Sequence, residues 1–303
     1  MSIWSRPAIR IAGAVLASGA LVLGSQTGAS ANSGANPASR GRFSGPSVIS
    51  FNVTTDGGYS MPPRVHSGFV TLRGSSPEAA YHAVQGFSLK PGVSLAQAKQ
   101  DITAVLSDDS VTALAGLRAL YRDIVEIGGV VTSPYAAQEV TIPLERGTYY
   151  FVDLSDPLLR YHTLRAVGNF KWSTPPRFTT VIESTMVNGQ PRFRAPSTLA
   201  HNGTFLAVVT GDEFHETVFR PVVPGTTDAY VTAFYNAVLA GGPIPASPWT
   251  GFQAGLQSLS PGRWAIVHIN LAPGPYELIC YVPSDENLIP HGWMGMHKLM
   301  RLT

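Results

Sequence analysis

The sequence predicts an all-β protein with small helical insertions, arranged as two tandem β-sandwich domains. The 303 residues include 30 Gly and 24 Pro but only 13% charged residues, which is typical of short strands joined by turns. Apolar runs such as Phe205–Val209 and Trp264–Leu271 are bounded by Gly or Pro. The chain also repeats itself with a period near 130 residues, which is too long for a solenoid repeat and suits two copies of one domain.

The N-terminus has the features of a secretory signal peptide. Arg6 and Arg10 precede an apolar run over Ile11–Gly24, and the small residues Ala29-Ser30-Ala31 follow it. We expect a signal peptide over residues 1–31 and cleavage after its last residue, which makes the mature chain secreted or extracytoplasmic. The apolar run is short for a membrane span, and no later segment supplies about 20 uninterrupted apolar residues. We therefore predict no membrane span.

The charge balance excludes several classes of partner. Without the two arginines of the predicted signal peptide, the chain carries 19 basic and 19 acidic side chains, a net charge of zero. A neutral chain does not attract phosphate backbones or anionic lipid surfaces. We predict no nucleic-acid partner.

Two ungapped blocks reveal the internal repeat. Tyr81–Leu106 aligns with Phe214–Leu239 at a constant offset of 133 residues. Ile142–Asp153 aligns with Ile269–Cys280 at an offset of 127 residues. Two blocks in the same order are hard to obtain by chance, so we interpret them as an internal duplication.

Turn-forming residues place the boundaries of the two copies. A loose leader rich in Ser, Gly and Ala covers residues 32–46, and the Pro-containing segment 173–177 is a short stiff linker. The first copy is then 47–172 and the second copy 178–303.

Helical spacing predicts three helices. Apolar residues at helical intervals over Leu95–Val105 follow Ser94 as a candidate N-cap, and the aligned Thr227–Leu239 shows the same pattern. A further helix is predicted over 112–127, ended by Gly128-Gly129.

The second copy contains the only cysteine, Cys280, at the end of the strand pattern Tyr276–Cys280. In an exported protein a lone cysteine cannot form an internal disulfide, and on an apolar strand it is by itself typical of a buried inert residue. His291 and Met296 follow on the same loop, and His215 lies in the first repeat block. One thiolate, two imidazoles and a weak axial thioether form the ligand set of blue-copper electron-transfer sites.

Two segments carry a resemblance to a known superfamily. "LAPGPYELICYVPSDENLIPHGWMGM" resembles the C-terminal ligand loop of cupredoxins, and its ending, H-x3-G-M, is similar to that of copper nitrite reductases and plastocyanins. "FLAVVTGDEFHETVF" resembles the cupredoxin segment that delivers the first histidine. The resemblance implies a Greek-key sandwich in each copy and one type 1 copper in the second. It implies as ligands His215, Cys280, His291 and Met296.

The sequence departs from the family pattern at three points. Ten residues separate Cys280 from His291, which is a long interval for a cupredoxin. Glu216 stands where many members have Asn. Met294 is an alternative axial ligand, although the spacing favours Met296.

The first copy lacks the thiolate. His82 aligns with His215, and His162 aligns with the second histidine when two loop residues are omitted, but Asp153 occupies the cysteine position and Val167 lies near the methionine position. Replacing a thiolate by a carboxylate removes the soft ligand. We predict a scaffold domain without a complete copper site, with a weak His/Asp site for zinc or Cu(II) as the alternative.

These observations predict an exported copper-binding protein that transfers single electrons to or from a redox partner protein that the sequence does not identify. The chain has no H-x-H pair, and Ile279 and Tyr281 flank Cys280, so it lacks the histidines of a second copper centre and an oxidase is not expected. Two alternatives stay open. One is a structural or binding module of the cell exterior with a vestigial, metal-free site, and the other is copper capture or delivery.

Overall fold

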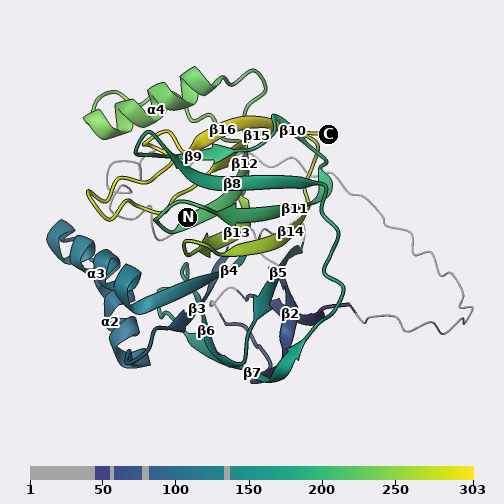
Figure 1. Cartoon of the computed structure of the whole chain (residues 1–303). Helices are drawn as coiled ribbons and strands as arrows, with labels where there is room; N and C mark the ends of the chain where they lie inside the picture. The colour runs from purple at the N-terminus through teal and green to yellow at the C-terminus, as the bar shows by residue number, and fades with distance from the viewer. Residues whose placement is uncertain (1–44, 55–57, 77–81, 133–136) are drawn as a thin grey trace, which may run out of the picture.

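The computed structural model describes residues 45–54, 58–76, 82–132 and 137–303 (Figure 1). The predicted signal peptide and nearly all of the predicted leader lie outside these residues. Within the described part of the chain, no helix is both long and apolar enough to cross a membrane.

The first sandwich has two layers of strands. One layer has the order β4-β3-β6-β7, and the other contains β5, β2 and β1, with β7 joining the layers through parallel pairing with β2. The strands are β1 (Ser47–Asn52), β2 (Arg64–Ser75), β3 (His82–Leu89), β4 (Ile124–Thr132), β5 (Gln138–Leu144), β6 (Gly147–Asp153) and β7 (Tyr161–Lys171).

The second sandwich is built in a similar way. One layer has the order β10-β16-β15-β12-β13, and the other has the order β14-β11-β8-β9. The strands are β8 (Thr180–Val187), β9 (Gln190–Arg194), β10 (Thr198–Leu199), β11 (Asn202–Val209), β12 (His215–Pro221), β13 (Ala254–Leu259), β14 (Trp264–Asn270), β15 (Gly274–Ile279) and β16 (His297–Leu302).

Both layers continue from one sandwich into the other. The antiparallel pairs β4 with β13 and β5 with β14 join them edge to edge, so that the second sandwich stands above the first in Figure 1. Strands that are not consecutive, such as β3 with β6 and β12 with β15, pair within each sandwich, as Greek-key connections require. The predicted all-β class with two tandem sandwiches is confirmed.

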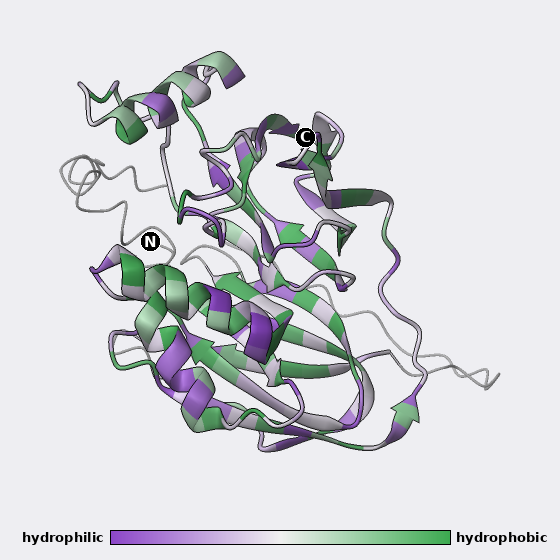
Figure 2. Cartoon of the chain, turned by 60° about the vertical axis from the view of Figure 1, so that its left-hand side comes forward, coloured by the Kyte–Doolittle hydropathy of each residue, from purple (hydrophilic) through white to green (hydrophobic). Residues whose placement is uncertain are grey.

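Among the described residues, three helices lie outside the layers: α2 (Leu95–Val105), α3 (Ser110–Asp123) and α4 (Asp228–Ala240). Ser94 caps α2 through its side-chain oxygen, as the sequence predicts. Thr227, the first residue of the predicted second helix, lies just before α4 and caps it in the same way. Figure 2 shows hydrophobic and hydrophilic residues mixed along these helices, in keeping with one buried face on each.

The predicted helix over 112–127 is wrong at its C-terminal end. The helix begins at Ser110 and ends at Asp123, and the following residues form β4, because Ile124 and its neighbours pair with β3 and are buried. Gly129 does not end a helix. It lies inside β4, where a Cβ atom would stand 2.0 Å from the carbonyl oxygen of Val84, so this close approach of two strands requires glycine.

Buried side chains also join the two sandwiches. Gln85 on β3 accepts a hydrogen bond from the Ser258 N–H (3.0 Å), and its amide nitrogen donates to the Ser258 carbonyl (3.1 Å). Beside it, the Glu126 N–H donates to Ser260 Oγ (2.8 Å), and the Ser260 N–H donates to the Glu126 carbonyl (3.0 Å). These contacts satisfy backbone groups that strand pairing leaves unpaired at the junction.

Replacing Gln85 by Ala should therefore destabilise the chain. The change leaves the buried N–H and C=O of Ser258 without these partners, at a cost of about 2–4 kcal/mol in the free energy of unfolding. Urea denaturation measures this cost, with Gln100→Ala on the exposed face of α2 as the matched control. Equal stability of the two variants would contradict the role of Gln85.

Candidate metal centre

The first histidine of the site begins β12. His215 is 1% exposed, and its Nε2 atom faces Gly211 in the preceding turn, where a Cβ atom would stand 3.1 Å from that nitrogen. The Nε2 atom has no hydrogen-bond partner among the described residues, and Nδ1 lies 3.8 Å from Cys280 Sγ. The imidazole is thus buried with Nδ1 directed toward the sulfur.

Strand pairing places the cysteine. Cys280 directly follows β15, whose Ile279 pairs with Val218 of β12, so the sulfur is brought beside the start of β12. The N–H of Glu216 donates to Cys280 Sγ at 3.3 Å. The thiol is fully buried.

The long interval before the second histidine folds back on itself. Within Ser284–Ile289, backbone hydrogen bonds close a turn, and the His291 N–H then donates to the Val282 carbonyl (2.9 Å). The Gly292 N–H donates to the Cys280 carbonyl (2.8 Å). The ten-residue spacer is therefore compact, and His291 Nδ1 lies 3.6 Å from Cys280 Sγ.

Three of the four predicted ligands converge. The ligand atoms of His215, Cys280 and His291 all lie within 4.8 Å of one another, and the two imidazole centroids are 4.7 Å apart. One ion bound at about 2.0 Å by nitrogen and about 2.3 Å by sulfur requires donor atoms at such separations. The arrangement can hold a single soft or borderline metal ion.

The fourth predicted ligand is buried on the same loop. The Met296 N–H donates to the His291 carbonyl (2.8 Å), and its carbonyl accepts from the Cys280 N–H (3.4 Å). Met296 is fully buried, whereas Met294 is partly exposed and its carbonyl accepts from Arg192 Nη1 (2.7 Å). The role of Met296 as an axial ligand stays a prediction.

Burial sets the protonation of the donor atoms. Desolvation and then the nearby His291 lower the pKa of His215 to about 3, so its imidazole is neutral at neutral pH. Desolvation and then the charge of Glu216 raise the pKa of the Cys280 thiol well above its usual value. A bound cation offsets both penalties on the thiolate, so metal binding at this site releases a proton.

Glu216, at the position where the family often has Asn, connects the two segments of the site. Its Oε2 atom accepts from the Tyr281 N–H (3.1 Å), while its own N–H donates to the cysteine sulfur. Burial raises the pKa of this carboxyl group to about 7. The side chain therefore ties the start of β12 to the residue after Cys280.

A helix of the first sandwich contacts both loops of the site. On α3, Tyr121 stacks on Phe214 (centroids 3.9 Å, interplanar angle 11°), and its hydroxyl accepts from the Phe214 N–H (2.9 Å). Arg118 Nε donates to the Asp285 carbonyl (2.9 Å) on the ligand loop. No local sequence pattern indicates these residues, because their contacts depend on how the two sandwiches pack.

The sequence analysis also missed Glu213. Its Oε2 atom lies 2.9 Å from His291 Nε2. Burial raises the pKa of this carboxyl group, but hydrogen bonding and charge interaction with His291 outweigh it and leave the pKa below its usual value. Its position two residues before His215 is the only sequence signal.

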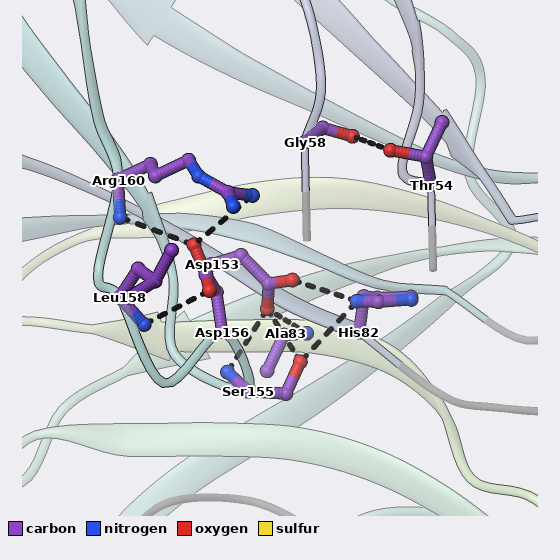
Figure 3. Close-up of polar contacts among 9 residues, drawn as sticks. All are labelled: Thr54, Gly58, His82, Ala83, Asp153, Ser155, Asp156, Leu158 and Arg160. Atoms are coloured by element: carbon purple, nitrogen blue, oxygen red, sulfur yellow. Dashed lines mark hydrogen bonds and ion pairs between the residues drawn. The ribbon is translucent and has the colours of Figure 1, made fainter. Parts of the chain in front are cut away.

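The corresponding position in the first sandwich is closed by hydrogen bonds (Figure 3). His82 Nδ1 donates to Asp153 Oδ2 (2.7 Å), and Asp153 Oδ1 accepts from the Ala83 N–H (3.1 Å) and from Ser155 Oγ (2.6 Å). His162 instead packs its ring against Tyr59, with centroids 4.1 Å apart.

No second cluster of metal-ligand type is present in the described residues. Among the described residues, His215, Cys280 and His291 form the one group of three or more His, Cys, Asp or Glu side chains whose ligand atoms converge. The aligned Val167 is 40% exposed on β7. These observations give no support to the alternative of a His/Asp metal site in the first sandwich.

Comparisons with known proteins give structural matches alone. No protein family model matches the chain, and no curated protein does. Among solved structures, the chain is similar to an auracyanin from Roseiflexus castenholzii, with 19% identity over 42% of this chain and 99% of that one at a TM-score of 0.26. Auracyanin A, a "blue" copper protein from Chloroflexus aurantiacus, matches with 19% identity over 40% and 99% of the two chains at a TM-score of 0.27.

A longer match extends across both sandwiches. The copper nitrite reductase from Nitrosomonas europaea aligns over 86% of this chain and 94% of that one, with 11% identity and a TM-score of 0.22. Because the identities and TM-scores are low, we base the function on the donor atoms of this chain.

Removing the carboxylate of Asp153 should destabilise the first sandwich. Asp153→Ala leaves the buried donors of His82, Ala83 and Ser155 without their acceptor, and we expect a loss of about 3 kcal/mol in the free energy of unfolding. Denaturant unfolding measures it, with the exposed Glu286→Ala as control. A loss no larger than that of the control would show that the His82–Asp153 contact is dispensable.

His215 should make the metal-free chain less stable in acid. Its pKa is about 3 in the folded chain and about 6.5 when unfolded, so between these values the unfolded chain binds a proton that the folded chain excludes. Stability therefore falls as the pH falls through this window. Between pH 7 and 5, the free energy of unfolding should fall by about 2 kcal/mol less in His215→Gln than in the wild-type chain. Urea unfolding of the EDTA-treated chain at both pH values tests this, and an unchanged difference would contradict it.

Proposed function

We propose that the chain is an exported cupredoxin that transfers single electrons through one type 1 copper in its C-terminal sandwich. His215, Cys280 and His291 would hold the metal, and Met296 would be the axial ligand. The observation that carries the proposal is the convergence of one thiol sulfur and one nitrogen from each of two imidazoles within 4.8 Å in a buried site. This soft, mixed donor set is the one that suits copper.

The contrast between the two sandwiches supports a site built for a metal. In the first sandwich, Asp153 accepts a hydrogen bond from His82 Nδ1 and so occupies the nitrogen that would face an ion. In the second, both Nδ1 atoms face the sulfur of Cys280 at 3.8 and 3.6 Å. Burying these polar donor atoms costs free energy. Their convergence therefore favours a site that binds a metal over a vestigial one.

The residues of the chain supply a rigid, dry environment. When bound, copper would supply a one-electron redox couple, with the thiolate providing the most covalent bond. Strand pairing, the Glu216 contacts and the folded-back loop hold the ligands in place, so little rearrangement would accompany a change of redox state. The full burial of Cys280 and His291 favours electron transfer over copper delivery, which needs an exposed and exchangeable site.

Further parts of the proposal rest on the sequence. The predicted signal peptide supports export, and the absence of an H-x-H pair supports a protein without a second copper centre. The order of elements supports the internal duplication, because β3, α2 and β6 in the first sandwich correspond to β12, α4 and β15 in the second. We propose the first sandwich as a scaffold without copper and a separate protein as the redox partner.

Copper addition to the purified mature chain tests the proposal. We expect one Cu(II) per chain and an intense absorption band at about 600 nm from copper–thiolate bonding. Cys280→Ser should abolish the band. His82→Gln, the matched change in the first sandwich, should leave both the band and the stoichiometry unchanged. A chain that binds no copper, or binds it without this band, would overturn the proposal.

A further inference from the structure

The second histidine of the site is held from both sides of its ring. His291 Nδ1 lies 3.6 Å from Cys280 Sγ, and on the opposite edge Nε2 lies 2.9 Å from Glu213 Oε2. We propose that Glu213 is a positioning residue, which accepts the Nε2–H of His291 and thereby fixes the tautomer whose Nδ1 lone pair points at the metal. This inference rests on the proposed copper site and adds a residue that sets its affinity and reduction potential.

Burial makes the contact specific. The side chain of His291 is 0% exposed and that of Glu213 is 12% exposed, so water competes little for the imidazole N–H. A charge-assisted hydrogen bond in such a place is stronger than one at the surface. The ring is therefore held in one orientation before any metal arrives.

Glu213 is itself held by both loops of the site. Its Oε1 atom accepts from the Asp285 N–H at 3.3 Å, which joins it to the ligand loop. The next residue, Phe214, is fixed by its stacking on Tyr121 and by its hydrogen bond to the Tyr121 hydroxyl. The first sandwich thus contributes to the position of this carboxylate through α3.

The first sandwich shows the opposite use of a carboxylate. There, Asp153 Oδ2 accepts a hydrogen bond from His82 Nδ1. In the second sandwich, Glu213 Oε2 lies 2.9 Å from His291 Nε2, while Nδ1 of the same ring faces the sulfur. A carboxylate beside one ring nitrogen favours the proton on that nitrogen and leaves the lone pair on the other. The histidine can then serve as a ligand only through the other nitrogen.

The chemical consequence follows from charge. A carboxylate hydrogen-bonded to a ligating imidazole raises the basicity of the ligand, and loss of such a partner typically lowers metal affinity 10- to 100-fold. Its negative charge stabilises Cu(II) more than Cu(I), because Cu(II) carries the larger positive charge. Removing it should raise the reduction potential, by about 59 mV for each tenfold change in the ratio of the two affinities.

The first experiment uses the metal-free chain and does not depend on copper. Imidazole 15N–1H NMR should show His291 as the Nε2–H tautomer in the wild-type chain, with the signals assigned by their loss in His291→Gln. In Glu213→Ala this single tautomer should give way to a mixture or to the Nδ1–H form. An unchanged tautomer in Glu213→Ala would overturn the inference, whatever the protein does with copper.

The second experiment uses the copper-loaded chain. Glu213→Ala should lower Cu(II) affinity 10- to 100-fold and raise the reduction potential. Glu213→Gln keeps an acceptor but removes the charge, and should recover part of the affinity. Asp212→Asn, an adjacent exposed residue with the same loss of charge, should change both quantities little. Circular dichroism confirms that each variant is folded.

The outcomes separate this inference from the proposed function. If the wild-type chain binds no copper, the proposed function fails, while the tautomer measurement still decides the role of Glu213 in holding His291. If the wild-type chain has the blue band and Glu213→Ala matches its affinity and potential, the inference fails and the proposed function stands.

Discussion

The pairing of β15 with β12 is the constraint on which the site depends. It brings Cys280, the residue directly after β15, beside His215, the first residue of β12, although the two lie 65 positions apart in the sequence. Backbone hydrogen bonds of a ladder fix this placement without help from a metal. The remaining ligand loop has only to fold back from this fixed point, and its backbone contacts to Val282 and Cys280 do so.

The two sandwiches contribute different parts of the candidate site. The second carries the converging donor atoms, while the first supplies α3, which contacts the turn before His215 through Tyr121 and the ligand loop through Arg118. Continuous strand pairing across the junction makes the two sandwiches one support for the site. The absence of a thiolate from the corresponding position of the first sandwich is thus compatible with a structural role for that sandwich.

Carboxylates around the histidines decide what each site can do. Asp153 closes the position in the first sandwich by pairing with the nitrogen that would face a metal. Glu216 and Glu213 in the second sandwich bind backbone or the far edge of a ring, and leave the inner donor atoms facing one another. Carboxylates therefore accompany a closed, hydrogen-bonded histidine in one sandwich and a candidate metal centre in the other, because they approach different atoms.

The sequence by itself determined the all-β class and the helix cap at Ser94, because strand and cap patterns are local properties. It also pointed to His215, Cys280 and His291 as candidate ligands from their donor types, and the structure brings their ligand atoms together. It misplaced the end of α3, where β-sheet pairing of Ile124 and its neighbours outweighed the helical spacing. Only the tertiary structure decided that the ten-residue spacer is compact and that Glu213 reaches His291. It alone also decided that α3 contacts the site. These contacts join segments far apart in the chain or depend on loop conformation, which no local pattern encodes.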